Sequence, residues 1–144
     1  MLWFVSFNIR YTFVIISGDS MQPTFKDGDI VVADKKFSII RDDVYFVLNP
    51  DDDTLSVKRL IGIPKDNISF VDGVMFRNEK YIDDFSAQDY ENRDYRLGDD
   101  EYLFIGDNRT KSMDGRYWSR LLKEEDIVAR LKYRIYPFHR IGGV

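Results

Sequence analysis

Two residues of this chain have side chains that could carry out nucleophilic chemistry together, Ser20 and Lys58. Ser20 follows the glycine-containing turn Ser17-Gly18-Asp19, and Lys58 lies in an apolar run over residues 55–62. A serine hydroxyl needs a base to become a nucleophile, but the single histidine, His139, is close to the C-terminus. A desolvated lysine can take the place of histidine. We therefore interpret the pair as the dyad of a Ser-Lys protease.

Lys58 can serve as a base only if its surroundings disfavour positive charge. A lysine amine normally has a pKa of about 10.4, and burial or a neighbouring cation lowers it. Residues 54–61 are predicted to form a strand, whose alternation places Ser56, Lys58 and Leu60 on one face. Lys58 would then lie against an apolar wall. The alternative is an ordinary lysine on a strand edge in solvent.

Gly18 suggests where a substrate carbonyl could approach the chain. Glycine permits the backbone conformations of a sharp turn and leaves room for close contact with the main chain. The N–H of Ser20 would then point toward the oxyanion that develops during acyl transfer. The alternative is a turn glycine with no catalytic meaning.

A third group of polar residues follows a predicted buried strand, in the segment 106–118. Either Asp114 or Asp107 could form a bidentate pair with Arg116 and fix this loop. Ser112 could then accept a hydrogen bond from, or donate one to, the amine of Lys58 and aim it at Ser20. The alternative is a solvated turn with incidental charges.

The pattern along the chain predicts many short strands and little helix. Apolar and β-branched residues indicate strands, Asp72-Gly73 indicates a hairpin turn, and residues 119–126 could form a short helix. Residues 83–100 are polar and predict a surface excursion. We expect an all-β fold of folded-over antiparallel sheets, similar to a β-barrel. Residues 1–66 and 101–144 would form the catalytic domain, with a small inserted hairpin region over 67–100. The predicted strands cover residues 11–16, 30–33, 44–48, 54–61, 68–71, 74–76, 102–105 and 127–136.

Composition excludes several classes of function. The 144 residues contain no cysteine, which rules out disulfides, a thiol nucleophile and thiolate metal ligands. The net charge of −4 comes without a basic stripe, so we expect no nucleic-acid partner. The acidic groups Asp51–Asp53 and Asp83–Asp84 are interpreted as solvated turns, so we expect no metal and no cofactor.

The N-terminal segment Met1–Phe7 is apolar but is interrupted by Asn8 and Arg10. It is shorter than the roughly 20 apolar residues that a spanning helix requires. Two interpretations stay open: the remnant of a membrane anchor, or a first strand with an apolar end. Trp3, Phe4 and Phe7 could contact a bilayer or belong to a core.

Taken together, these stretches resemble bacterial type I signal peptidases, especially the Gram-positive forms with a short insertion. Four motifs occur in the order of the family, and a similar ending covers residues 134–142. The motifs cover residues 17–24, 27–31, 57–64 and 106–116.

The resemblance implies a membrane-anchored serine endopeptidase that removes signal peptides from exported preproteins. Such enzymes cut after small residues at positions −1 and −3, with the catalytic domain on the extracytoplasmic face of the membrane. Ser20 would be the nucleophile, Lys58 the general base, and the Ser20 N–H an oxyanion donor. Gly18 corresponds to a position where some members carry a hydroxyl that supplies a second donor. The supporting residues would be Ser112, Asp107, Asp114 and Arg116, while Met21 and Pro23 would contact substrate.

Three residues depart from the family pattern: Lys65 and Ser119 replace glycine, and Gly115 replaces serine. A missing or truncated anchor would be a fourth departure. A homologue that binds surface proteins without cutting them is the main alternative, although it would not need both Ser20 and Lys58. A self-cleaving Ser-Lys repressor is a third possibility, but the chain has no room for a DNA-binding region.

Overall fold

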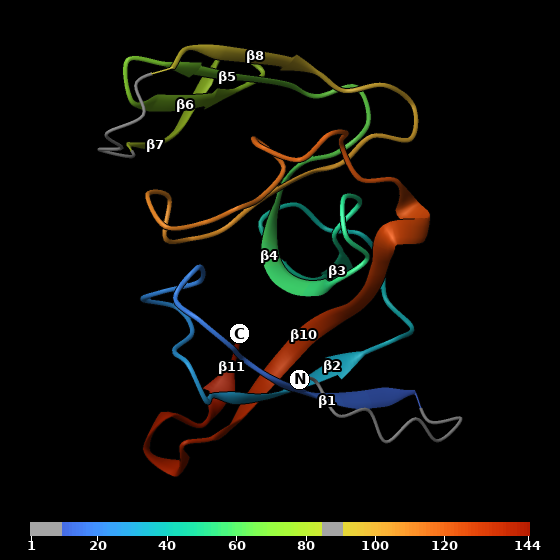
Figure 1. The fold of residues 1–144 in the computed structure, drawn as a ribbon, viewed down its shortest axis with the longest axis vertical. Helices are drawn as coiled ribbons and strands as arrows, with labels where there is room; N and C mark the ends of the chain where they lie inside the picture. The colour runs from blue at the N-terminus through green and yellow to red at the C-terminus, as the bar shows by residue number, and fades with distance from the viewer. Residues whose placement is uncertain (1–9, 85–90) are drawn as a thin grey trace.

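Strands account for nearly all regular structure in residues 10–84 and 91–144, the part of the chain that the computed structural model describes (Figure 1). The larger sheet has the strand order β1-β2-β10-β3-β4-β9, with β11 added to β10, and the smaller sheet has the order β7-β6-β5-β8. Every pairing is antiparallel. The larger sheet consists of β1 (Tyr11–Ile15), β2 (Ile30–Asp34), β3 (Val44–Leu48), β4 (Leu55–Gly62), β9 (Leu103–Ile105), β10 (Ile127–Tyr136) and β11 (Gly142–Gly143). The smaller sheet consists of β5 (Asn67–Val71), β6 (Val74–Arg77), β7 (Lys80–Asp84) and β8 (Arg93–Arg96).

This arrangement confirms the predicted all-β class with antiparallel sheets. The pairing leaves β1 and β9 as separate edges, so the strands of the described residues do not close into a barrel. Two short 3-10 turns, η1 (Glu124–Asp126) and η2 (Phe138–Arg140), are the helical elements of the described ranges. Within those ranges, no helix has the length and apolar character needed to cross a bilayer.

The strands predicted from alternation are present, and the corrections concern the polar segments. The segment 83–100, predicted as a surface excursion with no strand in it, begins with the last two residues of β7 and contains β8, which pairs with β5. The strand β8 does alternate, since Tyr95 packs on Phe70 while Asp94 and Arg96 face solvent. The alternation is hard to see in the sequence because three of the four residues of β8 are charged. The helix expected over 119–126 is reduced to the single turn η1.

The alternation predicted for 127–136 holds only over its first half. Ile127, Ala129 and Leu131 are buried, but Tyr133 is 59% exposed. Register shifts in the pairing with β2 fall between Leu131 and Tyr133 and between Arg134 and Tyr136. These bulges turn the aromatic side chains of the second half outward. The predictions made for Met1–Phe7, including Trp3, Phe4 and Phe7, lie outside the described residues.

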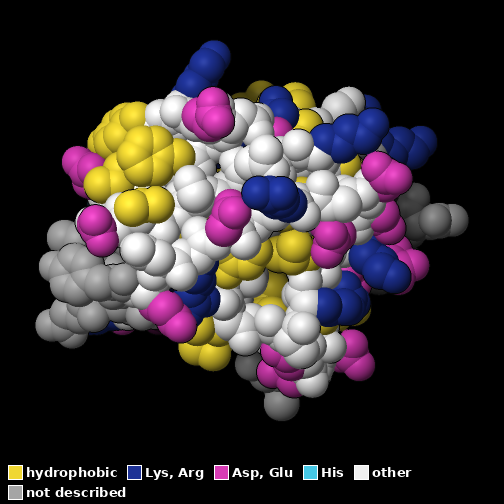
Figure 2. Space-filling model, turned by 90° about the horizontal axis from the view of Figure 1, so that it is seen from above, with side chains coloured by type: hydrophobic (Ala, Val, Ile, Leu, Met, Phe, Trp, Pro, Cys, Tyr) yellow, Lys and Arg dark blue, Asp and Glu magenta, His cyan; other side chains and the backbone are white. Residues whose placement is uncertain are grey.

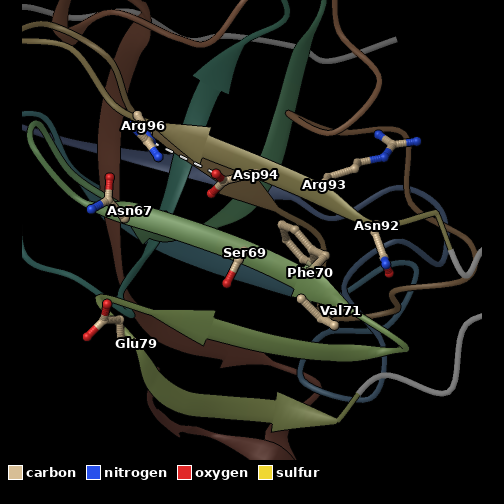
Figure 3. A pocket seen from close by; sticks show the side chains of 9 residues that line it. All are labelled: Asn67, Ser69, Phe70, Val71, Glu79, Asn92, Arg93, Asp94 and Arg96. Carbon is tan, nitrogen blue, oxygen red and sulfur yellow. Dashed lines mark ion pairs between the residues drawn. The ribbon is translucent and has the colours of Figure 1, made fainter.

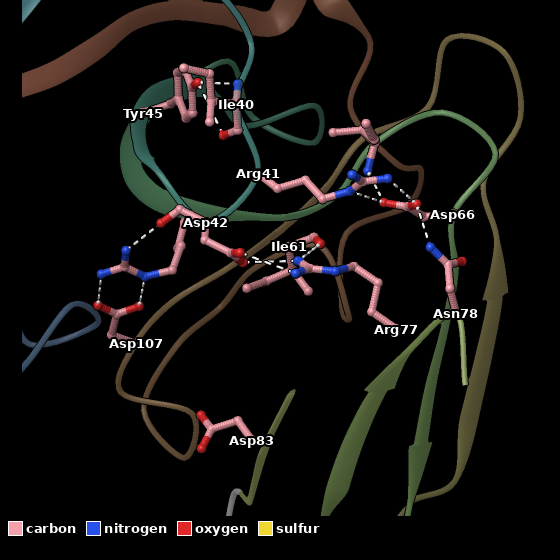
Figure 4. Close-up of polar contacts among 12 residues, drawn as sticks. Ile40, Arg41, Asp42, Tyr45, Ile61, Asp66, Arg77, Asn78, Asp83 and Asp107 are labelled. Atoms are coloured by element: carbon pink, nitrogen blue, oxygen red, sulfur yellow. Dashed lines mark hydrogen bonds and ion pairs between the residues drawn. The ribbon is translucent and has the colours of Figure 1, made fainter. Parts of the chain in front are cut away.

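An apolar cluster joins the two sheets, and ion pairs reinforce the junction. The cluster includes Ile61 and Ile105 from the larger sheet and Ile68 and Phe70 from the smaller one. Figure 4 shows Arg77, the last residue of β6, beside Asp42 in the loop that precedes β3, and the two form an ion pair of 2.9 Å. The two sheets are therefore held together by packing and by charge.

Asp66 is the most strongly bonded carboxylate of this junction (Figure 4). It is buried and accepts hydrogen bonds from Arg41 at 2.6 and 2.8 Å and from Asn78 at 2.9 Å. Burial alone would raise the pKa of Asp66, but the bonds from Arg41, the Ile63 N–H and Asn78 lower it to about 2. Asp66 therefore stays ionised at neutral pH and keeps its partners in place.

Candidate active site

Ser20 lies in the loop of residues 16–29, which joins β1 to β2. Two backbone hydrogen bonds of 2.8 Å close the base of this loop, from Ile16 N–H to Asp29 O and from Gly28 N–H to Ile16 O. Met21 and Phe25 are fully buried and anchor the loop in the core. The half-buried Ser20 is thereby held at the surface of the larger sheet.

The turn at Gly18 has the left-handed conformation that favours glycine, with φ of 81°. The N–H of Gly18 donates to Asp27 Oδ1 at 2.8 Å. The N–H of Ser20, by contrast, donates no hydrogen bond to another described residue. Ser20 therefore offers an available backbone donor close to its own hydroxyl.

Lys58 extends from the middle of β4 to Ser20. Its Nζ lies 2.8 Å from Ser20 Oγ, and the residue is only 4% exposed. Burial lowers the pKa of Lys58, and Arg116 adds to this effect, while Asp114 opposes it. The alternation predicted Lys58 on the same face of β4 as Leu60, which is fully buried. The structure agrees, because Lys58 lies opposite Tyr45 of β3, and the Tyr45 side chain is also fully buried. An amine in this environment favours its neutral form more than a solvated lysine does.

The loop of residues 106–116 packs beside this pair and is fixed by Asp114. Asp114 is completely buried and forms a bidentate pair with Arg116, at 2.9 and 3.0 Å. Its Oδ2 also accepts the Gly106 N–H at 2.9 Å, and Arg116 Nη2 donates to the Arg109 carbonyl at 2.8 Å. Of the two pairs considered from sequence, Asp114–Arg116 is the one that forms.

Asp107 instead connects three segments of the chain. Its carboxylate accepts Arg59 at 2.8 and 2.7 Å and the Thr24 hydroxyl at 2.5 Å. Arg59 directly follows Lys58, and Thr24 belongs to the 16–29 loop. Burial alone would raise the pKa of Asp107, but the bonds from Arg59 and Thr24 lower it. Asp107 therefore ties both candidate catalytic segments to the 106–116 loop.

Ser112 is buried in this loop, although the bond predicted for it is absent. Its Oγ has no hydrogen-bond partner among the described residues, so it makes no hydrogen bond with Lys58 Nζ. Gly106 leaves room for the Ser112 side chain, since a Cβ at position 106 would lie only 2.5 Å from Ser112 Cβ and 2.6 Å from the Ser20 carbonyl oxygen. Gly106 thus lies between the Ser112 side chain and the Ser20 carbonyl, and this packing, not a hydrogen bond to Lys58, brings Ser112 close to Ser20.

Asn108, Thr24 and Arg59 are site residues that the sequence analysis did not single out. The Asn108 N–H donates to the Ser20 carbonyl at 2.9 Å, and its Nδ2 donates to the Asp19 carbonyl at 3.0 Å. All three lie inside the motifs, but the contacts that join them to Ser20 or Asp107 cross from one motif to another, over 48 to 88 positions of the chain. Only the pairing of the loops could have shown these contacts.

A small cavity of about 80 Å³ opens beside Ser20. Met21 contributes to its wall, but Pro23 is exposed and is not among its lining residues. The wall is largely apolar and comes from two extended segments and the residues around Ser20: Val14, Ile15, Ile16, Ser17, Ser20, Met21, Phe46, Leu55, Ser56 and Val57. Its size and apolar wall suit a small side chain.

Two of the three departures from the family pattern, Gly115 and Ser119, have local explanations, whereas the lysine at position 65 has none in the structure. Gly115 packs against β9, where a Cβ would lie 2.8 Å from the Phe104 carbonyl oxygen. The Ser119 N–H donates to Asp51 at 3.1 Å, and its hydroxyl also bonds to Asp51. Lys65 has φ of 72°, a conformation in which glycine would be unstrained.

A wider and more polar hollow lies away from the dyad, on the outer face of the smaller sheet. Figure 3 shows Ser69 and Val71 of β5 at its floor and Asp94 and Arg96 of β8 along one side. Figure 2, seen from the end of the molecule that carries this sheet, shows cationic and anionic side chains interspersed. No group of three or more His, Cys, Asp or Glu residues in the described ranges is arranged to hold a metal ion.

An amine poised on a serine hydroxyl beside an apolar cavity, in an all-β fold, has the form of a serine peptidase site. The family model for signal peptidases, peptidase S26, matches residues 1–136. The chain therefore belongs to the S26 signal peptidase family, as the motifs predicted. Membership confirms that the chain is of the peptidase and hydrolase class.

Several curated relatives carry the name signal peptidase I. A probable signal peptidase I-2 of Synechocystis is 31% identical over 88% of this chain and 64% of its own length. Signal peptidase I U of Bacillus subtilis is 28% identical over 92% of this chain and 81% of its own length. Signal peptidase IB of Staphylococcus aureus is 30% identical over 85% of this chain and 76% of its own length. The chain thus spans under two thirds of the first of these relatives and more of the others.

A solved structure supports the fold independently. The crystal structure of a signal peptidase I from Enterococcus faecalis superposes with a TM-score of 0.55, at 22% identity, over 66% of this chain and 97% of that chain. At this identity the similarity concerns the fold alone.

Proposed function

We propose that this chain is a serine endopeptidase whose Ser20-Lys58 dyad removes signal peptides from exported preproteins. The observation that carries the proposal is the 2.8 Å separation of Lys58 Nζ and Ser20 Oγ at a lysine only 4% exposed. Membership of the S26 family supports peptide hydrolysis as the reaction. The names of the relatives support signal peptides as the substrate class.

In the proposed mechanism, neutral Lys58 takes the proton of Ser20 Oγ as that oxygen attacks the scissile carbonyl. The N–H of Ser20 donates to the oxyanion of the tetrahedral intermediate. Lys58 then protonates the leaving amine, and an acyl-enzyme ester remains on Ser20. A water molecule, deprotonated by Lys58, hydrolyses this ester and frees Ser20. Gly18 supplies no side-chain hydroxyl, so its role is limited to the shape of the turn.

The 106–116 loop would orient the dyad without touching the substrate. Asp114 and Arg116 keep the loop rigid, and the Arg116 charge disfavours an ammonium at Lys58. Asp107 fixes Arg59, the neighbour of Lys58. Ser112 would approach the Lys58 amine when substrate enters, because its hydroxyl is buried nearby without a partner.

The substrate would bind as an extended peptide between β1 and β4. The cavity wall comes from residues 14–17 on one side and 55–57 on the other, with Phe46 between them in sequence, and β1 pairs only with β2 among the strands of the described residues. Edge strands bind extended peptides through main-chain hydrogen bonds, and pockets select alternate side chains. The small apolar cavity beside Ser20 would admit the small residue at −1, and the next alternate position would be −3. Met21 would contact the substrate there, whereas the exposed Pro23 would not line this cavity.

Cleavage of a preprotein with an Ala-x-Ala site tests this function. We expect cleavage after the second alanine, and at least about 100-fold slower cleavage when that alanine is replaced by tryptophan, whose bulk exceeds the cavity. Mass spectrometry of the products identifies the bond that is cut. Equal rates for the two preproteins would contradict the proposed pocket, and an absence of cleavage in both would contradict the proposed function.

We also propose that residues 67–100 are an insertion in a catalytic domain made of residues 1–66 and 101–144. The strands of the smaller sheet all fall inside that range, and the dyad and its cavity fall outside it. The insertion is short, as in the Gram-positive forms that the sequence resembles.

A second part of the proposal is that the catalytic domain contacts a membrane surface, on the extracytoplasmic side. The outer face of β1, β2 and β10 is apolar, since Phe13, Val32 and Tyr133 lie in register across it. Phe13 is 67% exposed, and Phe138, just beyond β10, is 77% exposed. Aromatic side chains of this kind suit the interface between water and lipid.

The membrane contact can be tested with vesicles. We expect Phe13→Ser combined with Phe138→Ser to weaken binding to phosphatidylglycerol-containing vesicles by about tenfold, because two exposed aromatic contacts are lost. Tyr81→Ser is the control, since Tyr81 is 58% exposed but lies on the smaller sheet. Sedimentation with vesicles measures the binding. Equal loss in the control and the double variant would show that the outer face of β1, β2 and β10 has no special role.

A further inference from the structure

Two arginines from the C-terminal part of the chain hold the end of the 16–29 loop. Asp29, the last residue of that loop, is buried, with its side chain 3% exposed. Arg134 Nε lies 3.1 Å from Asp29 Oδ2, and Arg140 Nη1 donates to Asp29 Oδ1 at 3.0 Å. A buried carboxylate needs such partners, and the two guanidinium groups supply them to Asp29.

The same arginines also bind the main chain of the loop, nearer to Ser20. Both Arg134 Nη2 and Arg140 Nη2 donate to the Thr24 carbonyl, the latter at 3.4 Å. The Thr24 hydroxyl in turn donates to Asp107 at 2.5 Å, and Asp107 holds Arg59 beside the lysine. Polar contacts therefore link the C-terminal segment to Thr24 and, through Asp107, to Arg59, the chain neighbour of Lys58.

The fold delivers Arg140 to this position by reversing the chain after β10. The η2 turn contains Arg140, and β11 then pairs back on β10, with Gly142 opposite Arg134. Figure 1 shows this red segment beside the base of the blue loop that carries Ser20. The side chain of Arg134 also lies over the buried Phe25 ring, with 5.1 Å between Cζ and the ring centroid. Arg134 thus contacts the loop at two places, the carboxylate of Asp29 and the ring of Phe25.

We infer that Arg134 and Arg140 are positioning residues for the nucleophile, an inference that rests on the proposed function. Neither side chain contacts Ser20 Oγ or Lys58 Nζ, so their effect passes through Asp29 and the Thr24 carbonyl. Without them the 24–29 segment can move away from the sheet, which lengthens the 2.8 Å contact on which proton transfer depends. Arginine suits the role because its planar fork binds a carboxylate and a carbonyl at once, whereas lysine offers a single charged point.

Steady-state kinetics of Arg140→Ala test the inference. We expect kcat to fall by about tenfold, because a small misplacement of a reacting group costs up to about 100-fold in rate. KM should stay within about twofold, because the cavity that would bind the substrate does not include Arg140. Arg140→Lys should recover part of kcat, and added methylguanidinium should recover part of the activity of Arg140→Ala.

Arg130→Ala is the matched control. Arg130 also extends from the C-terminal strand and pairs with Asp43 at 2.5 Å, and its side chain is 22% exposed against 21% for Arg140. Neither member of that pair contacts the 16–29 loop. We expect its kcat to equal that of the unmodified chain.

The result separates this inference from the function on which it rests. If the unmodified chain does not cleave the preprotein, the proposed function fails. If the unmodified chain cleaves and Arg140→Ala matches Arg130→Ala in kcat, the positioning role is wrong. The role is also wrong if neither lysine nor methylguanidinium recovers activity, because the loss would then reflect general damage to the fold.

Discussion

Replacing Lys58 with methionine is expected to reduce preprotein cleavage by at least about 10³-fold while the fold persists, because a general base contributes up to about 10⁴-fold. Methionine fills much of the space of the lysine stem but cannot accept a proton. Ser20→Ala should be equally inactive, because no nucleophile remains. The measurement is the rate of preprotein cleavage, with circular dichroism to confirm that each variant is folded.

The controls for this prediction come from the same chain. Lys80→Ala removes an exposed lysine of β7 and should leave the rate unchanged. The double variant of Ser20 and Lys58 should be no slower than either single variant, since residues that act as one unit are not additive. Cleavage at the normal rate by either single variant would overturn the dyad.

These variants also separate the protease from the non-cutting homologue that the sequence left open. A protease with Ser20→Ala should still bind preprotein, because the cavity beside position 20 is lined mainly by other residues. A chain that only binds would retain preprotein without cutting it even with both dyad residues present. Binding and cleavage measured on the same preparations distinguish the two.

The contact between Ser20 and Lys58 was predicted from the sequence, by residue type and local pattern together with the motifs around them. The alternation around Lys58 indicated which face of β4 it occupies. An amine on an apolar face is desolvated, which is the condition for a lysine to act as a base. The glycine turn before Ser20 similarly indicated an accessible hydroxyl. The turn and the alternation used only neighbours within a few positions, for which strand periodicity is informative. The pairing of the two residues also used the order of the motifs along the chain.

The contacts that hold the dyad in place could not be predicted in this way. Arg116 was the partner considered for Asp107 in the sequence, yet Asp107 pairs with Arg59, 48 positions away, because β4 and β9 are neighbours in the sheet. The contact of Arg140 with Asp29 spans 111 positions and depends on the reversal after β10. Such pairs follow from the order of strands, which local patterns do not encode.

Polar segments were the other source of error. The pattern of β8 is short and charged, so pairing with β5 decides its conformation more than its own propensity does. Ser112 illustrates a different limit: its position in the motif was correct, but its orientation depends on the space that Gly106 leaves. Propensity and motif therefore located the elements, while packing set the final geometry.

The activity should depend on pH through the neutral form of Lys58. Burial lowers the pKa of Lys58, Arg116 lowers it further, and Asp114 raises it. Because the base must be unprotonated, kcat/KM should rise with pH through this lowered pKa and fall by about tenfold for each pH unit below it. Measuring kcat/KM across pH locates the inflection, which should lie below the value of an exposed lysine.

The same shift predicts the direction of a stability change. Between the lowered pKa of folded Lys58 and its ordinary value in the unfolded chain, the unfolded state binds more protons. The free energy of unfolding should therefore rise as pH rises across that window. Below the folded pKa, Lys58 is charged in both states, and the full cost of burying its charge lowers the stability of the folded state. Lys58→Met removes the penalty, so the difference in unfolding free energy between the variant and the unmodified chain should shrink as pH rises. Two results together would show that Lys58 does not change protonation state in this environment. The first is a difference in unfolding free energy between Lys58→Met and the unmodified chain that stays constant with pH. The second is a kcat/KM of the unmodified chain that is the same from acidic to alkaline conditions.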